Sequence, residues 1–537
     1  MKKFIQSKPA QPLIYAICIV IGLVGGKKLY QDQSYQLGFS NAETSKGKIH
    51  DILNKIDKNY VDTIDFKSLE EESIVKIVKS LDPHSYYLTL EDMVGEDEKL
   101  NGNFSGIGVE FKIIDDTIVV LQPIKGGPSF KADILIGDKI IAVNHTNFTG
   151  DSITSALAMK YLKGVKGSEI TVDFLRDKKT ISKEITRAEI PLNSIDVFTV
   201  LKNEVGYIKI ARFSKRTNSE FEDAVDELLS HNIKSLIIDV RDNPGGLMGS
   251  VIKICESFLS KDKLIVSTKG RTESNEDFST SKGKLADYPL YVLINENSAS
   301  ASEILAGAVQ DHDRGIIIGR RSFGKGLVQR PFSLKDGSAL RLTIARYYTP
   351  SGRCIQRSYE QGNEEYYKES ISRLVKGELN SADSIPLPDS LKFYTSKGKL
   401  VYGGGGIIPD EFIATDTSAL SNIAREIFKG QEIDRFFLSH LNLWSEIMSN
   451  TDLSGSYKAF IKNDFLWNKF ESFLINRASF SIKSAELREL KEKVLPLLLG
   501  RILRMKFQDL GQYYYNLKND PEIAKALELH FKSLNSQ

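Results

Sequence analysis

The feature that most constrains the fold of this 537-residue chain is an alternation of apolar strands and amphipathic helices that starts near Val205. The predicted strands lie at 206–211, 235–240, 291–295, 316–318 and 339–348, with helical patterns at 219–229, after Gly246 and at 303–309. Repeated strand–helix units predict a mostly parallel sheet covered by helices. Functional residues in such sheets gather beyond the carboxyl ends of the strands.

Ser300 occupies such a position, in the turn between the strand at 291–295 and the next helix, where residues 298–303 read Ser-Ala-Ser-Ala-Ser-Glu. A hydroxyl group in this turn would stand at the positive end of the helix. The spacing from Ser300 to Glu303 is also that of a capping box. On this segment alone, a helix cap is the favoured interpretation.

A second segment changes that balance, because residues 324–329 read Gly-Lys-Gly-Leu-Val-Gln. Burial of Lys325 would disfavour the charged amine, so that a neutral lysine could take the proton of a serine hydroxyl. Gln329 could accept a hydrogen bond from this amine and orient it. Arg320 and Arg321 would lower the lysine pKa further if they lie close to it. The alternatives are a solvated loop or a phosphate contact, although a complete phosphate-loop pattern is absent.

Residues 242–246, Asp-Asn-Pro-Gly-Gly, form a turn after the strand at 235–240. Backbone N–H groups of Gly245 or Gly246, together with that of Ala301, would stabilise an oxyanion.

The histidines offer no alternative base. His312 follows on the same predicted helix as Ser300, about 18 Å away at a rise of about 1.5 Å per residue. His84 comes directly after Asp82-Pro83 and is interpreted as a turn residue with nothing to tie it to Ser300. Asp311 is expected to hold structure, with Arg314 as its partner.

Residues 103–188 predict a small separate domain, with strands at 118–121, 138–143 and 170–174 and one helix at 153–162. The loop of Gly106, Ile107, Gly108 and Val109 precedes a strand, and its successive N–H groups would form a nest for a carboxylate. A plain turn is the alternative for this loop.

Residues 1–30 carry the targeting signal, because Lys2, Lys3 and Lys8 precede an apolar run. Its length of about 14 residues fits a signal-peptide core better than a spanning helix of about 20. Export is predicted, with the segment either cleaved or kept as an anchor, and lysines on both sides leave the orientation open.

The rest of the chain outside the strand–helix alternation is mainly helical in pattern. Residues 45–100 and 418–537 predict helices, with a kink or restart at Pro496. Residues 358–400 are polar and predict an insertion.

The composition is that of an ordinary globular protein, with 41% hydrophobic and 26% charged residues. The 72 basic and 70 acidic residues give a net charge of +2, and no basic block indicates nucleic-acid binding. Cys18, Cys255 and Cys354 have no metal-ligand or disulfide-framework spacing. A bridge between Cys255 and Cys354 is the pairing left open, and two buried thiols are favoured over it.

Together these segments resemble the carboxyl-terminal processing peptidases, or tail-specific proteases, which are Ser/Lys-dyad serine endopeptidases with a PDZ domain. The resemblance runs from about residue 45 to about residue 413. It rests on the serine and lysine motifs, with support at 81–85, 242–246, 348–352 and 406–410. It implies a multidomain α/β protein in which a crotonase/ClpP-like protease core at 195–415 follows an inserted PDZ-like domain.

The same resemblance assigns the site residues. Ser300 is then the nucleophile, Lys325 the general base and Gln329 the residue that orients it, with Gly245 or Gly246 and Ala301 as the oxyanion hole. The family's PDZ domain binds the apolar C-terminal tail of the substrate, which here assigns the tail carboxylate to the loop 106–109.

The expected protein is a peptidase of the bacterial cell envelope, on the periplasmic side, which cleaves flexible protein tails without metal, nucleotide or other cofactor. Whether the protein is anchored in the inner membrane stays open. The helical region 418–537 is either a cap packed on the core, a contact between subunits of an oligomer, or a binding site for an adaptor protein. One rival is a silent exported PDZ scaffold, which the intact Ser300, Lys325 and Gln329 oppose. Another is a crotonase-like acyl enzyme, which the PDZ-like insertion and the export signal oppose.

Overall fold

The computed structural model divides the chain into two compact units, residues 1–78 and 79–537. It describes Ala16, Ile19, Val20, Gly22 and residues 44–535, apart from Glu273, Thr280, 416–421, Gly430 and 477–483. The predicted targeting segment 1–30 therefore lies almost wholly outside the described residues. In the part of the chain that is described, no helix combines the length and the apolar character needed to cross a bilayer.

The first unit contains α3 (Thr44–Asn59) and α4 (Phe66–Lys79), whose last residue begins the second unit. Both helices agree with the 3–4 spacing of apolar residues in this region.

The small domain has the strands and the helix that the sequence predicts. Its main sheet has the order β3 (Val109–Ile114), β4 (Thr117–Pro123), β5 (Lys139–Val143), β7 (Glu169–Arg176) and β8 (Lys179–Thr186), with β6 (Thr146–Asn147) beside β5. The remaining elements are β2 (Asn103–Gly106), β9 (Ala188–Pro191), α6 (Pro128–Lys131) and α7 (Ser155–Leu162). β3 is an edge strand, and alternate residues such as Ile118 and Val120 fill the core of the domain.

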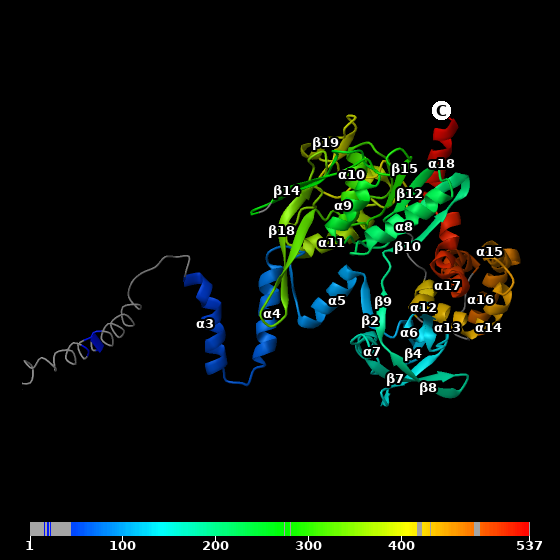
Figure 1. The fold of residues 1–537 in the computed structure, drawn as a ribbon, viewed down its shortest axis with the longest axis horizontal. Helices are drawn as coiled ribbons and strands as arrows, with labels where there is room; N and C mark the ends of the chain where they lie inside the picture. The colour runs from blue at the N-terminus through cyan, green and yellow to red at the C-terminus, as the bar shows by residue number, and fades with distance from the viewer. Residues whose placement is uncertain are drawn as a thin grey trace, which may run out of the picture. The chain divides into compact units, whose positions relative to one another are not determined.

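The second domain is built on a six-stranded sheet (Figure 1). Its order is β10 (Ile195–Val200), β11 (Val205–Ile210), β12 (Ser235–Asp239), β15 (Leu290–Ile294), β16 (Ile316–Gly319) and β21 (Glu411–Phe412). Every neighbouring pair is parallel except β10 with β11. The mostly parallel sheet is therefore confirmed, except that the predicted strand 339–348 lies in a second sheet, where its pairs are antiparallel.

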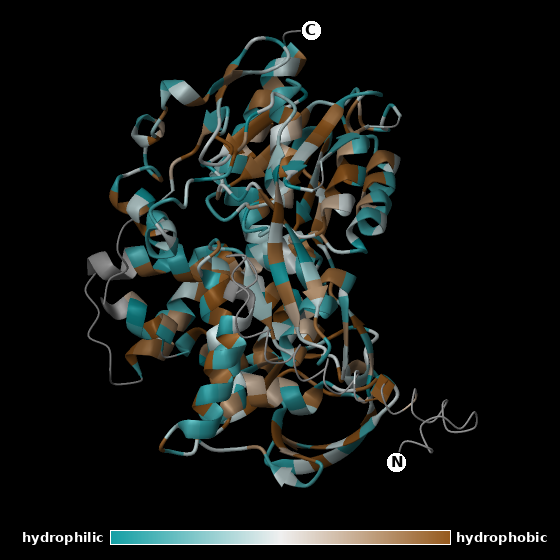
Figure 2. Cartoon of the chain, turned by 90° about the vertical axis from the view of Figure 1, so that its left-hand side faces the viewer, coloured by the Kyte–Doolittle hydropathy of each residue, from teal (hydrophilic) through white to brown (hydrophobic). Residues whose placement is uncertain are grey.

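Helices cover both faces of this sheet. On one face, Leu236 and Ile238 of β12 pack into a core with α8 (Thr217–Ser230), α9 (Met248–Glu256) and α10 (Ala301–Asp311). On the other face, Ile237 packs with residues of the C-terminal helices, among them Leu517 and Ile523. Several helices carry both hydrophobic and hydrophilic residues (Figure 2), as amphipathic helices require, whereas every residue of α10 is buried.

A second sheet joins remote parts of the chain. Its elements are β1 (Tyr86–Leu88), β18 (Ala339–Tyr348), β13 (Leu264–Gly270) and β14 (Ser274–Phe278), with β17 (Leu327–Ser333) also paired to β18. β1 lies inside the stretch 45–100 for which the sequence predicts only helices. Three residues that pair with a strand far along the chain leave no local periodicity, which explains the difference. The helix that follows, α5 (Leu90–Asn101), starts with an exposed capping box made by Thr89 and Asp92.

The insertion 358–400 contains α11 (Asn363–Val375) and β19 (Lys392–Tyr394), which forms a hairpin with β20 (Leu400–Tyr402) at the end of the insertion. Between these lie two short 3₁₀ turns, η2 (Ala382–Ser384) and η3 (Asp389–Leu391).

The C-terminal region is helical, as predicted. It comprises α12 (Asn422–Lys429), α13 (Glu432–Ser439), α14 (Leu441–Met448), α15 (Leu453–Ile461), α16 (Phe465–Ile475), α17 (Ser484–Asn519) and α18 (Pro521–Asn535). The break in α17 falls at Gln508 (φ 52°, ψ −144°), and not at Pro496 as expected. Gly500 and Gly511 allow the two halves of α17 to approach closely. A Cβ on Gly500 would lie 2.8 Å from the carbonyl oxygen of Gln512, and a Cβ on Gly511 would lie 2.5 Å from that of Leu503.

Candidate active site

Ser300 closes the turn between β15 and α10 in a backbone conformation that few residues adopt. Its φ is 56° and its ψ is −113°, a type of conformation that costs roughly 1–3 kcal/mol in a residue other than glycine. Neighbouring groups hold the turn, because the carbonyl of Asn243 accepts the N–H of Ala299 at 3.0 Å and the hydroxyl of Ser302 at 2.9 Å. Backbone strain maintained in this way is typical of functional turns.

Glu303 joins this serine turn to the lysine turn. Its Oε2 accepts the backbone N–H groups of Ser300 (2.8 Å) and Lys325 (2.9 Å), while its Oε1 accepts the N–H of Gly324 (2.7 Å) and the hydroxyl of Ser322 (2.6 Å). Burial raises the pKa of this carboxyl group, and the four donors oppose the rise. One buried carboxyl group therefore fixes the main chains of Ser300 and Lys325 next to each other.

The side chain of Lys325 is the predicted amine in a poorly solvated position. Its Nζ donates a hydrogen bond to Oε1 of Gln329 at 3.0 Å. Burial lowers the pKa of the Lys325 amine, and the charge of the Arg341 guanidinium lowers that pKa further. Both effects favour the neutral amine that a general base requires.

The cation that lowers the Lys325 pKa is Arg341, and not Arg320 or Arg321 as the sequence suggested. Arg320 forms an ion pair with Glu522 at 2.8 Å, and Arg321 forms one with Glu378 at 2.5 Å. Arg341 could not be chosen from the sequence, because it reaches the site through the pairing of β18 with β17.

Replacing Arg341 with glutamine is expected to move the acidic limb of the kcat/KM–pH profile to higher pH. The substitution removes a charge that lowers the Lys325 pKa and also frees Glu96, its ion-pair partner at 2.6 Å. Both changes raise the pKa of Lys325, so that more alkaline conditions are needed to reach the neutral amine. Arg346→Gln, at an exposed position on the same strand, is the control. A profile unchanged by Arg341→Gln contradicts this electrostatic role.

The turn of Gly245 and Gly246 lies directly against the serine turn. A Cβ on Gly246 (φ 142°) would lie 2.0 Å from the carbonyl oxygen of Phe213, and one on Gly245 (φ 101°) would lie 3.0 Å from the backbone nitrogen of Ala301. The N–H of Gly245 donates to Oδ1 of Asn243 at 2.8 Å. Only glycine fits at either position, and the N–H of Gly245 is already engaged.

A single cavity of about 950 Å³ brings together the residues predicted for catalysis. Its lining includes Ser300, Lys325, Gln329, Gly245, Gly246 and Ala301. Residues 106–109, predicted for the tail carboxylate, are not part of this lining. The structure thus brings the predicted nucleophile, base and oxyanion donors into one site and keeps the predicted tail-binding loop apart from it.

The loop 106–109 connects β2 to the edge strand β3. Gly108 has φ +74°, and a Cβ there would lie 2.9 Å from the side chain of Ile190. The carbonyls of Ile107 and Gly108 accept the N–H groups of Ser129 (2.9 Å) and Ile124 (3.0 Å). The carbonyl groups of the loop therefore point into the domain and are held there.

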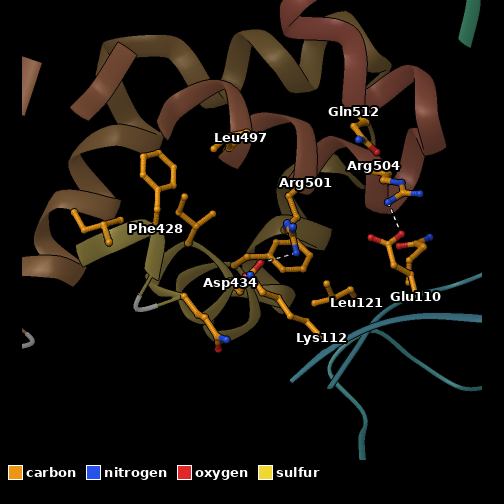
Figure 3. A pocket seen from close by; sticks show the side chains of 14 residues that line it. Glu110, Lys112, Leu121, Phe428, Asp434, Leu497, Arg501, Arg504 and Gln512 are labelled. Atoms are coloured by element: carbon orange, nitrogen blue, oxygen red, sulfur yellow. Dashed lines mark hydrogen bonds and ion pairs between the residues drawn. The ribbon is translucent and has the colours of Figure 1, made fainter. Parts of the chain in front are cut away.

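The C-terminal helices contact the same strand along its length (Figure 3). Arg504 forms an ion pair with Glu110 at 2.6 Å, and Gln431 Nε2 donates to the carbonyl of Ile113 at 2.9 Å. Asp434, which is buried, pairs with Lys112 and also with Arg501. A cavity of about 280 Å³ lies between these side chains. The helical region therefore packs on the small domain as well as on the main sheet.

The structure bears on three minor expectations from the sequence and revises the first of them. Asp311 forms its ion pair with Arg353 (2.7 Å), while Arg314 donates to backbone carbonyls. His312 bonds the carbonyl of Leu264 (2.7 Å) away from the cavity, as its distance along the helix predicts. The two cysteines Cys255 and Cys354 are free thiols, which is the favoured alternative.

Sequence reasoning missed two supporting residues. His84, interpreted as an unconnected turn residue, lines the cavity that contains Ser300. The hydroxyl of Tyr347 lies 3.0 Å from the carbonyl oxygen of Ser300 and 2.7 Å from that of Lys325. The motif at 81–85 was a signal for the first, whereas no local pattern marks Tyr347.

This fold and this site define a serine-type peptidase with a PDZ domain. Accordingly, the chain matches the model of "Peptidase family S41" over residues 204–363 and that of "PDZ domain" over residues 105–186. It is 36% identical to the carboxy-terminal-processing protease of Bartonella bacilliformis over 59% of this chain and 74% of the relative. It is also 34% identical to carboxy-terminal processing protease CtpA of Bacillus subtilis, over 67% of this chain and 75% of that relative.

Among solved structures, the photosystem II D1 C-terminal processing protease is 27% identical with a TM-score of 0.33, covering 57% of this chain and 88% of that one. The relatives named above settle the family. The chain belongs to the carboxy-terminal processing proteases of peptidase family S41. The predicted family, fold class and serine-peptidase activity are confirmed.

Proposed function

We propose that Ser300 is the nucleophile and Lys325 the general base of this peptidase. The observation that carries the proposal is the shared carboxyl group of Glu303, which holds both main chains beside one cavity. Neutral Lys325 takes the hydroxyl proton as Ser300 Oγ attacks the scissile carbonyl. The protonated amine then gives this proton to the leaving amine, and water hydrolyses the acyl-enzyme by the same route.

We assign the oxyanion hole to the N–H groups of Gly246 and Ala301. Gly245 was the other candidate, but its N–H donates to Asn243. The glycine turn remains necessary, because its backbone approaches Ala301 more closely than any side chain would allow.

Substrate recognition is proposed to begin at the small domain. The loop 106–109 would receive the terminal carboxylate through its N–H groups, and the tail would pair along the edge strand β3. The substrates would be proteins with flexible, apolar C-terminal tails. Since the segment 1–30 has the pattern of an export signal, we place the enzyme in the bacterial cell envelope, on the periplasmic side, with that segment cleaved or retained as an anchor.

The function is tested with two reporter proteins that differ only at the C-terminus. One carries a flexible apolar tail, and the other carries the same tail ending in two aspartates. Cleavage of the first reporter, with kcat/KM at least about tenfold above that of the second, is expected, because an acidic end is poorly accommodated by an apolar tail site. Equal cleavage of both reporters would refute tail recognition, and cleavage of neither would refute the proposed activity on such tails.

A further inference from the structure

The amide of Gln329 has only one orientation in which it can accept a hydrogen bond from Lys325. Its Nε2 donates to the backbone carbonyl of His84. A carbonyl oxygen can only accept, so the contact fixes the amino group on that side and leaves Oε1 facing Lys325 Nζ at 3.0 Å. The position of the His84 carbonyl therefore decides whether Gln329 presents an acceptor or a donor to the catalytic amine.

The turn that carries this carbonyl, residues 82–85, is fixed on one side by the second sheet. Asp82 Oδ1 accepts the N–H groups of His84 and Ser85, both at 2.8 Å. Ser85 Oγ in turn accepts the N–H of Thr343 in β18 at 3.0 Å. The turn is thus attached to the strand that also carries Arg341.

On its other side the turn is held by the insertion 358–400. The hydroxyl of Tyr366 in α11 bonds Nε2 of His84 at 2.7 Å, and the hydroxyl of Tyr367 donates to the carbonyl of Pro83 at 2.5 Å. Asn363, at the start of α11, donates to the carbonyl of Lys79 at 2.5 Å. Three side chains from one helix thus contact one short segment.

Tyr366 also reaches the lysine turn. Gln356 Nε2 lies 3.5 Å from the Tyr366 hydroxyl, and Gln356 Oε1 accepts the N–H of Gly326, the residue after Lys325. The ring of Tyr366 is 2% exposed and packs 3.9 Å from the guanidinium of Arg357. The hydroxyl is therefore held rigidly between the two segments that flank the catalytic amine.

We propose that α11 of the insertion 358–400 is a positioning element for the catalytic base, and that Tyr366 and Tyr367 act on Lys325 through the turn 82–85 and Gln329. The inference rests on the proposed roles of Lys325 and Gln329. Because Gln329 accepts one hydrogen of the amine, the nitrogen lone pair is directed elsewhere in the cavity that contains Ser300. This gives the insertion a role in the rate of the chemical step.

The test is a double-mutant cycle between Tyr366→Phe and Gln329→Ala in the full chain, with the apolar-tailed reporter as substrate. Tyr366→Phe removes one hydroxyl and is expected to lower kcat about tenfold with KM unchanged, which is part of what a positioned base contributes. In the Gln329→Ala background the same substitution should have a much smaller effect, because only the weaker route through Gln356 remains. Tyr359→Phe is the control, because the Tyr359 ring packs against Tyr366 but its hydroxyl bonds Arg346, outside this chain of hydrogen bonds; this variant should match the parent enzyme.

An unchanged kcat in Tyr366→Phe, or an equal fall in both backgrounds, overturns the inference. Since Tyr366 is buried, Tyr367→Phe provides an independent variant at a residue that is 58% exposed, and the substitution keeps the ring that packs against Tyr366. It should lower kcat in the parent and leave kcat unchanged in Gln329→Ala. Ser300→Ala separates a failure of the catalytic assignment from a failure of the role proposed for the insertion. If Ser300→Ala keeps its activity, the catalytic assignment fails. If Ser300→Ala is inactive while both tyrosine variants are fully active, only the role of the insertion is refuted.

Discussion

Replacing Ser300 with alanine is expected to lower kcat/KM for a tailed reporter by at least about 10⁴-fold, because the hydroxyl that would form the acyl-enzyme is removed. Stability should change little, since the backbone contacts of the turn, including the N–H bond to Glu303, do not use the hydroxyl. Rates are measured by the appearance of the cleaved reporter and folding by the thermal midpoint. Ser274→Ala, at an exposed position in β14, is the matched control.

Replacing Lys325, the proposed general base, is expected to lower kcat/KM as much as replacing Ser300. Lys325→Met keeps the length of the side chain and removes the amine that would accept the proton. Because both residues serve one proton transfer, the double variant should be no slower than either single variant. Residual turnover near the parent rate in a single variant would remove the replaced residue from the mechanism.

The second large effect is expected for Glu303→Gln. Each carboxylate oxygen of Glu303 accepts two hydrogen bonds, and on each oxygen at least one donor is a backbone N–H that cannot reverse its role. In either orientation, the amino group of glutamine would face such an N–H. We expect kcat to fall by roughly 10³-fold, the scale of a disturbed catalytic group, and the free energy of unfolding to fall by about 1–3 kcal/mol, as for a buried group left unsatisfied.

Asp92→Asn is the matched control for this prediction, because Asp92 closes an exposed capping box at the start of α5. It should cost at most about 1 kcal/mol of stability and leave kcat unchanged. If Glu303→Gln behaved in the same way as Asp92→Asn, Glu303 would be only a helix cap, which is the alternative that the spacing from Ser300 first suggested.

The spacing from Ser300 to Glu303 shows how much of the site can be predicted from the sequence alone. Strand–helix alternation, the serine turn, the lysine between glycines and the glycine turn are all local patterns, and each is found in the predicted place. Ser300 and Glu303 do form the backbone contact of a capping box. Its second connection, to the N–H of Lys325, depends on how two turns meet in space and has no local signature.

The parts that escaped prediction are those made by pairing over long distances. β1 exists only because Tyr87 lies opposite Leu340 of β18. Arg341 reaches Lys325 through the same strand, and His84 reaches Gln329 through the turn before β1. A single sequence displays residue types and spacing, whereas these contacts depend on strand register, which joins remote segments in β1 and β18 and neighbouring segments in the hairpin of β17 and β18. The break at Gln508 instead of Pro496 is also a tertiary effect, because the close crossing of Gly500 and Gly511 defines it.

The attachment of residues 79–85 to α11 has a consequence for biosynthesis. The two segments are separated by some 284 positions in the chain, as in the hydrogen bond from Tyr367 to Pro83. Ser300 and Lys325 leave the ribosome before Tyr366 and Tyr367 do. On the proposed arrangement, a nascent polypeptide holds its nucleophile and its amine without an oriented Gln329 beside the amine until the insertion is translated and folded. The order of synthesis itself would then delay proteolytic competence and protect the emerging chain from its own cleavage.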